Sequence, residues 1–155
     1  MIVADIMTRR VHTCRPNDTL DRAARLMWEH DCGAIPIMDD RVGTLGVVTD
    51  SDICMAAYTR GEPLHRIRVT VAGSHRVYSV RPDASVEFVQ ALMKRHRGHR
   101  LPVVDVGGNL VGIMSIADIV RTSQRARRPD GAPCEEEVAC TLAEMYRPSG
   151  RTRLF

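Results

Sequence analysis

A repeat with a period of 66 residues constrains the fold of this chain more than any other feature. Residues 46–53 read Gly-Val-Val-Thr-Asp-Ser-Asp-Ile, and residues 112–119 read Gly-Ile-Met-Ser-Ile-Ala-Asp-Ile. Both copies contain a glycine, two apolar residues, a hydroxyl residue, two variable positions, an acid and an isoleucine. At the same offset, residues 3–55 lie on residues 69–121 without a gap. Two long copies predict a pair related by a pseudo-twofold axis, because solenoid repeats are shorter and more numerous.

Repeat 1 (residues 1–60) predicts a strand, a helix, a hairpin of two strands and a second helix. Apolar residues recur on one face of the first helix, from Leu20 through Met27 to Trp28, and Gly33 is expected to end that helix. Gly61 is expected to end the second helix. The remaining elements are expected at Val11–Cys14, Ala34–Met38, Thr44–Val48 and Asp50–Thr59.

Repeat 2 (residues 69–122) predicts the same order of elements after a linker at residues 61–68. Its strands and helices are expected at Arg76–Val80, Ser85–Arg97, Arg100–Val106, Leu110–Met114 and Ile116–Ser123. Residues 123–155 have no counterpart in repeat 1. They predict a basic linker at Arg125–Pro133 and a short helix at Cys134–Tyr146. The fold class is therefore α/β (α+β), with tandem β-α-β-β-α repeats, pseudo-twofold symmetry and a C-terminal helical tail.

Composition narrows the class of protein. Hydrophobic residues make up 44% of the chain and aromatic residues 4%, which indicates a folded domain with an aliphatic core. No apolar run approaches the roughly 20 residues that span a bilayer, and the N-terminus lacks a secretory signal, so we expect a cytoplasmic protein without membrane contact. The five cysteines form no CxxC pair, which favours reduced thiols over a disulfide framework. A net charge of +3 is too small to indicate nucleic-acid binding by itself.

The repeated motif has the chemistry of a nucleotide site at the start of a helix. A strand that turns into a helix exposes free N–H groups, which can bind a phosphate. Thr49 or Ser115 adds a hydroxyl there. Asp52 or Asp118 adds a carboxylate, which can accept hydrogen bonds from both hydroxyls of a ribose. The same spacing is that of a helix capping box. The aspartates therefore have two interpretations, caps or ligands, and both can hold because a ligand can displace a cap.

Together these features resemble a tandem pair of cystathionine-β-synthase (CBS) domains, also called a Bateman module. The resemblance rests on the fixed offset, on both copies of the motif and on the (Ile/Leu)-Pro-(Ile/Val)-x-Asp strands at Ile35–Asp39 and Leu101–Asp105. It covers Met1 to about Thr122. It implies a non-catalytic regulatory sensor that binds AMP, ADP, ATP, S-adenosylmethionine or NAD, has no covalent cofactor, and forms a homodimer through its helices.

The resemblance also implies which residues bind the ligand. Asp52 and Asp118 correspond to the ribose ligands, and Thr49 and Ser115 to the ligands on the phosphate side. The other positions that it assigns to the ligand site are Thr13, Ile35, Pro36, Leu101 and Pro102.

The two copies differ around the motif. In copy one Asp50 places a second carboxylate at the helix start, which would repel a phosphate, whereas copy two has the uncharged pair Ile116-Ala117 there. Residues 99–103, His-Arg-Leu-Pro-Val, are similar to a stretch in the regulatory γ subunits of AMP-activated kinases, in which the His and the Arg reach ligand phosphates. The similarity implies that His99 and Arg100 are candidate phosphate contacts, with a solvated basic loop as the alternative. Copy two is therefore expected to be the better phosphate site, although its basic side chains could also serve a ligand held by copy one.

Other functions stay open at this level. An interaction module with degenerate sites would present the tail helix to an unidentified protein partner, and a nucleic-acid binder would use Arg125–Arg128. His96 and His99 have no nearby acid or cysteine to complete a metal site. Cys32, near the expected pocket, is a minor redox hypothesis. An enzyme is not expected, because the chain shows no nucleophile–base pair, metal set or Walker-type loop.

Overall fold

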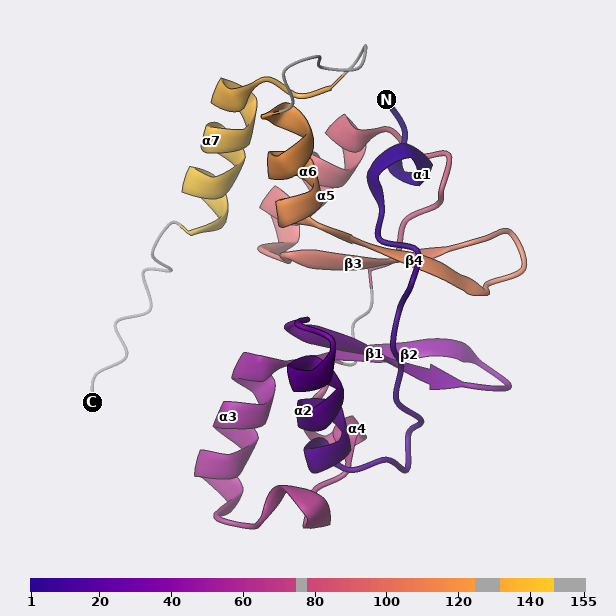
Figure 1. Ribbon diagram of the computed structural model, residues 1–155, viewed down its shortest axis with the longest axis vertical. Helices are drawn as coiled ribbons and strands as arrows, with labels where there is room; N and C mark the ends of the chain where they lie inside the picture. The colour runs from indigo at the N-terminus through magenta and orange to yellow at the C-terminus, as the bar shows by residue number, and fades with distance from the viewer. Residues whose placement is uncertain (75–77, 125–131, 147–155) are drawn as a thin grey trace.

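The computed structural model describes residues 1–74, 78–124 and 132–146. Two antiparallel hairpins lie next to each other in the middle of the molecule, with helices on the outer sides (Figure 1). The strands of the first hairpin are β1 (Ala34–Asp39) and β2 (Gly43–Thr49), and those of the second are β3 (Arg100–Val104) and β4 (Leu110–Ser115). This arrangement confirms the mixed α/β class with two repeats.

The two long helices of each repeat pack on the hairpin of that repeat. Leu20, Ala23 and Met27 are buried on the first helix, and Val86, Val89 and Met93 are buried at the equivalent positions on its counterpart. Apolar residues at helical spacing therefore define the inner faces of both helices. The bounds are α2 (Leu20–Glu29) and α3 (Asp50–Arg60) in repeat 1, and α5 (Val86–His96) and α6 (Ile116–Ser123) in repeat 2.

The repeats exchange their first helical turns, which the sequence did not reveal. The turn α1 (Val3–Ile6) opens repeat 1 but lies in the core of repeat 2, and α4 (Val69–Ala72) opens repeat 2 but lies in the core of repeat 1. The N–H of Val3 donates to the carbonyl of Ala84 at 2.9 Å, and the N–H of Val69 donates to that of Asp18 at 2.9 Å. Each hydrophobic core is therefore completed by the other repeat. The residue bounds given above for the two repeats stay predictions.

The exchanged segments explain why each copy of the motif begins with glycine. A Cβ on Gly46 would lie 2.5 Å from the carbonyl oxygen of Ser74, which follows α4. A Cβ on Gly112 would lie 2.6 Å from Sδ of Met7 and 3.1 Å from the carbonyl oxygen of Thr8, which follow α1. Real Cβ atoms do not approach other atoms so closely, so the crossing segment requires a residue without a side chain.

The hairpins, α3, α5 and α6 agree with the sequence predictions to within about two residues. Two local predictions for repeat 1 were wrong. The expected strand at Val11–Cys14 is reduced to a bridge between Cys14 and Ile37. Asp31, with φ of 47°, makes the left-handed turn after α2, and Gly33 does not. Trp28 is 90% exposed and so lies outside the core of the described residues, and its place in an interface stays a prediction.

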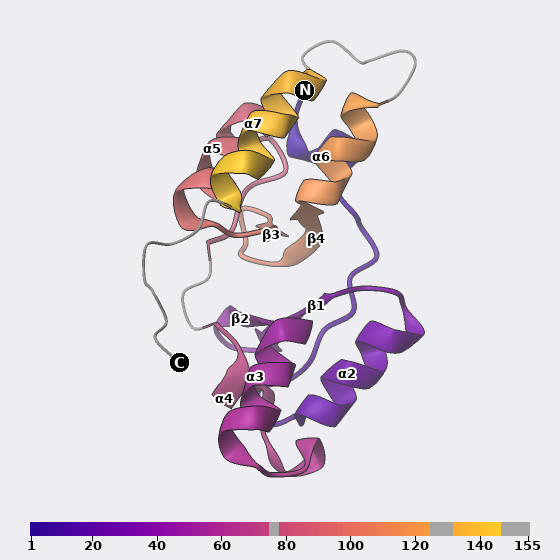
Figure 2. The same cartoon turned by 90° about the vertical axis from the view of Figure 1, so that its left-hand side faces the viewer.

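The tail helix is confirmed as α7 (Glu135–Met145), which packs on α5 and α6 of repeat 2 (Figure 2). Val138 and Met145 join the core of repeat 2, while Tyr146 is exposed. Most of the expected linker at Arg125–Pro133 and part of the expected strand at Arg76–Val80 lie outside the described residues. The linker that joins the two repeats along the chain contains a 3-10 turn, η1 (Leu64–Arg66), which packs on α2. Among the described residues no helix is long and apolar enough to cross a membrane.

Candidate functional site

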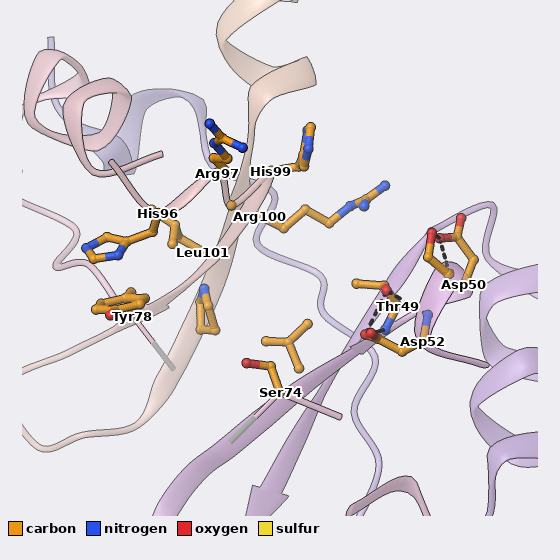
Figure 3. A pocket seen from close by; sticks show the side chains of 14 residues that line it. Thr49, Asp50, Asp52, Ser74, Tyr78, His96, Arg97, His99, Arg100 and Leu101 are labelled. Atoms are coloured by element: carbon orange, nitrogen blue, oxygen red, sulfur yellow. Dashed lines mark hydrogen bonds between the residues drawn. The ribbon is translucent and has the colours of Figure 1, made fainter. Parts of the chain in front are cut away.

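A pocket of about 460 Å³ lies where the start of α3 faces the strand entrance of repeat 2 (Figure 3). We call it the Thr49 pocket. Repeat 1 provides the helix start, including Thr49 and Asp52, and repeat 2 provides basic and apolar side chains. The residues that line it are Val47, Thr49–Asp52, Ser74, Tyr78 and His96–Pro102.

A second pocket of about 530 Å³, the Ser115 pocket, has the opposite composition. Its helix start comes from repeat 2 and its strand entrance from repeat 1. Most of its positions are those of the Thr49 pocket shifted by 66 residues, as in Ser115 for Thr49 and Ile113 for Val47. The residues that line it are Thr8, Arg10–His12, His30–Ala34, Arg100, Ile113, Ser115, Ala117 and Arg121.

A stacked pair of rings occupies the same position in each pocket. Tyr78 lies on His96 (Figure 3), and the ring centres are 3.7 Å apart with planes at 19°. His12 lies on His30 with ring centres 3.4 Å apart and planes at 3°. Such pairs present flat aromatic surface on one wall of each pocket.

Both copies of the motif form the capping box that the spacing allows. The carboxylate of Asp52 accepts hydrogen bonds from the N–H of Thr49 at 2.9 Å and from its hydroxyl at 2.7 Å, and the N–H of Asp52 donates to Thr49 Oγ1 at 3.2 Å. Ser115 and Asp118 repeat these contacts. The capping interpretation is therefore confirmed for both aspartates, and the ligand interpretation stays a prediction.

The two aspartates differ in what else they contact. Asp118 is 4% exposed, and its second oxygen accepts hydrogen bonds from Arg121 and from Thr8 Oγ1. Asp52 is partly exposed to the Thr49 pocket, and its second oxygen has no hydrogen bond within the described residues. A ligand hydroxyl can therefore bind Asp52 without breaking the cap, whereas Asp118 must first release Arg121.

The basic residues of repeat 2 lie in the Thr49 pocket, together with the acidic helix start of repeat 1 (Figure 3). The alternative that basic side chains of repeat 2 serve a ligand held by copy one fits this arrangement, although Arg100 also lines the Ser115 pocket. Which copy binds phosphate better stays a prediction. Burial, aided by the nearby charge of Arg100, lowers the pKa of His99 below its usual value. His99 is therefore a neutral hydrogen-bonding group near pH 7, and Arg100 supplies the positive charge.

The structure gathers six of the predicted ligand residues in one place: Thr49, Asp52, His99, Arg100, Leu101 and Pro102 all line the Thr49 pocket. Ser115 lines the other pocket, behind which Asp118 is buried. Ile35 and Pro36 are buried in β1, and Thr13 lines a separate hollow beside the hairpin turns.

Sequence reasoning missed Thr8, His12, Ser74 and Tyr78 as pocket residues. The signal that could have found them is the offset itself, because Thr8 pairs with Ser74 and His12 with Tyr78 across 66 residues. Among the described residues no group of three or more His, Cys, Asp or Glu side chains is placed to hold a metal ion.

Two facing repeats, each completing the other's core and each contributing to two interfacial pockets, define a tandem-repeat module. The CBS domain family model matches residues 3–58 and 71–125. The chain therefore belongs to the CBS domain family and contains a pair of these domains. The tail helix α7 lies outside both matches.

Similar proteins share this architecture. The CBS domain-containing protein YhcV of Bacillus subtilis is 38% identical over 117 residues, which are 76% of this chain and 81% of that protein. The CBS domain pair of protein MJ0100, solved with 5′-methylthioadenosine and S-adenosyl-L-methionine, superposes with a TM-score of 0.71 and 26% identity, over 78% of this chain and 94% of that one. CBSX2, solved with AMP, gives a TM-score of 0.67 and 29% identity, over 77% and 93% of the chains.

Proposed function

We propose that this protein is a non-catalytic regulatory module that binds an adenosine nucleotide, with the Thr49 pocket as its principal site. One observation carries the proposal. A helix start with an available carboxylate oxygen, two basic residues and an apolar strand converge on a single pocket, although they come from different repeats. The adenosine ligands of the structures of MJ0100 and CBSX2 support the same ligand class.

The chemistry of the pocket suggests how such a ligand would lie. Ribose hydroxyls would donate to Asp52, whose second oxygen has no partner within the described residues. The base would lie on the apolar surface of Val47 and Leu101. The phosphate would face the guanidinium of Arg100, because the first N–H groups of α3 already donate to Gly33, Asp50 and Thr49. Because Asp50 also lines the pocket, we expect one phosphate to be preferred over three.

Regulation would follow from the position of the ligand between the repeats. A ligand that contacts both repeats stabilises the arrangement in which those contacts are made, and it shifts the equilibrium by its differential affinity. We expect a homodimer to carry this signal. The five cysteines are all free thiols, which supports a reducing, cytoplasmic location.

Thermal unfolding in the presence of AMP, ADP, ATP, NAD, S-adenosylmethionine and RNA tests the proposal. We expect AMP to raise the unfolding temperature in proportion to the logarithm of its concentration above the dissociation constant. Asp52→Ala should reduce that shift, whereas Asp40→Ala, a control at an exposed carboxylate outside the pocket, should not. If no adenosine compound changes the unfolding temperature of the wild-type protein, the sensor function is refuted. A shift with RNA alone would favour a nucleic-acid binder.

A further inference from the structure

Arg100 is the one side chain that lines both pockets of the described chain. It leaves β3 and extends across the interface toward Asp50 and Thr49 of repeat 1 (Figure 3). Its charge acts on a group in each pocket. It contributes to the lowered pKa of His99 in the Thr49 pocket, and it opposes the rise in pKa that burial gives Cys32 in the Ser115 pocket.

The path of Arg100 across the interface depends on a glycine of repeat 1. A Cβ on Gly33 would lie 2.7 Å from Nη2 of Arg100 and 3.1 Å from Oδ2 of Asp50. Gly33 lines the Ser115 pocket and Asp50 lines the Thr49 pocket, so the guanidinium lies at the boundary between the two. This also gives Gly33 a role other than the helix end that the sequence predicted.

The pseudo-symmetry of the two pockets breaks at this position. Sixty-six residues before Arg100 the chain has Ala34, which cannot supply a charge. Among the described residues the other arginines divide between the pockets, since Arg97 lines only the Thr49 pocket and Arg10 only the Ser115 pocket. Arg121 also lines the Ser115 pocket, but it is paired with Asp118. Two equivalent strand entrances therefore share a single arginine.

We propose that Arg100 is a common anion contact for both pockets and that it makes phosphate-bearing ligands in the two pockets antagonistic. The proposal rests on the adenosine-nucleotide function given above. A phosphate bound in one pocket neutralises the guanidinium, so a second ligand meets a weaker positive field and the negative charge of the first ligand. A ligand without phosphate, such as adenosine, does not use Arg100 and binds the two pockets independently.

Site-resolved titration tests this coupling. Backbone amide signals in ¹H–¹⁵N spectra report each pocket separately, with Gly98 in the Thr49 pocket and Ala117 in the Ser115 pocket. The comparison is between the affinity of the Ser115 pocket for AMP in the wild-type protein and in Asp52→Ala, in which binding to the Thr49 pocket is lost. We expect the wild-type affinity to be at least about fivefold weaker, because the Thr49 pocket is then already filled. With adenosine, the same comparison should give less than a twofold difference.

The matched variants are Arg100→Gln and Arg97→Gln, which remove the shared and the unshared cation. Arg100→Gln should weaken AMP in both pockets and reduce the antagonism to the direct repulsion between the two phosphates, while Arg97→Gln should weaken AMP in the Thr49 pocket alone. The proposal is overturned if Arg100→Gln affects only one pocket, if AMP fills a single pocket whatever the variant, or if adenosine shows the same antagonism as AMP. A wild-type protein that binds neither AMP nor adenosine would instead refute the proposed function itself.

Discussion

The two capping aspartates should contribute unequally to stability, although their motifs are equivalent. Asp52→Ala removes an acceptor for the N–H and hydroxyl of Thr49, which is the ordinary loss of a helix cap. Asp118→Ala removes the same contacts to Ser115, and it also removes the acceptor of Arg121 and of Thr8. Thr8 belongs to the segment that crosses from repeat 1, so Asp118 also joins the two repeats.

The magnitudes follow from these contacts. Loss of a cap costs about 1 kcal/mol, which is the expected destabilisation for Asp52→Ala. In Asp118→Ala the two further contacts of a buried carboxylate add about 0.5–1 kcal/mol each, for a total of about 2–3 kcal/mol. The difference between the variants is then about 1–2 kcal/mol. With a denaturant slope of about 2 kcal/mol per molar urea, it corresponds to a midpoint about 0.5–1 M lower for Asp118→Ala.

Urea unfolding followed by far-ultraviolet circular dichroism measures this difference without added ligand. Asp40→Ala is the control, because Asp40 is exposed and its ion pair is a long surface contact, with Oδ2 4.0 Å from Nη2 of the exposed Arg15. Its midpoint should match that of the wild-type protein. If Asp52→Ala lowers the midpoint as much as Asp118→Ala does, then the buried contacts of Asp118 add nothing, and the inferred asymmetry of the two sites is wrong.

Three further predictions concern packing, association and pH. Gly46→Ala should destabilise the fold by about 2 kcal/mol in urea unfolding, because the new Cβ would displace the crossing segment at Ser74. Gly98→Ala is the control: a Cβ at Gly98 has no atom within 4 Å, so the free energy of unfolding should change by less than about 0.5 kcal/mol. Equal effects of the two variants would contradict the crossing geometry. Trp28→Glu should convert the expected homodimer to a monomer in sedimentation experiments. Val106→Glu, at an exposed position on a hairpin turn, is the control and should leave the dimer intact. A dimer unaffected by Trp28→Glu would place the interface elsewhere. The pKa of His99 is lowered in the folded state, so the unfolded chain binds more protons and His99 makes stability rise with pH in the window just below about 6.5. His99→Gln should therefore flatten the pH dependence of the urea midpoint between about pH 5.5 and 7.5. An unchanged slope would exclude His99 as the source of that dependence.

Local signals in the sequence predicted the elements well, because caps and apolar periodicity act over a few residues. Thr49 and Gly61 bound α3 as expected, and Ser115 begins α6 as expected. Pairings between distant segments could not be predicted in this way. The hydrogen bond from Val3 to Ala84 joins residues of different repeats, and no spacing rule distinguishes it from packing within one repeat. The pockets depend on such pairings, so the sequence predicted several of their residues but could not decide which residues of the two repeats share a pocket.

The tail helix makes the two outer helix faces of the module different. In repeat 2, Gln90 on α5 donates a buried hydrogen bond to Thr141 on α7 at 3.2 Å, so the tail occupies that face. The equivalent position in repeat 1 is Ala24, which lines an apolar groove on α2 and α3 beside the exposed Trp28. An apolar groove next to a large exposed ring costs free energy in water, and a second copy of the chain would remove it. We therefore expect association through repeat 1 alone, because α7 already fills in repeat 2 the place that a partner would take.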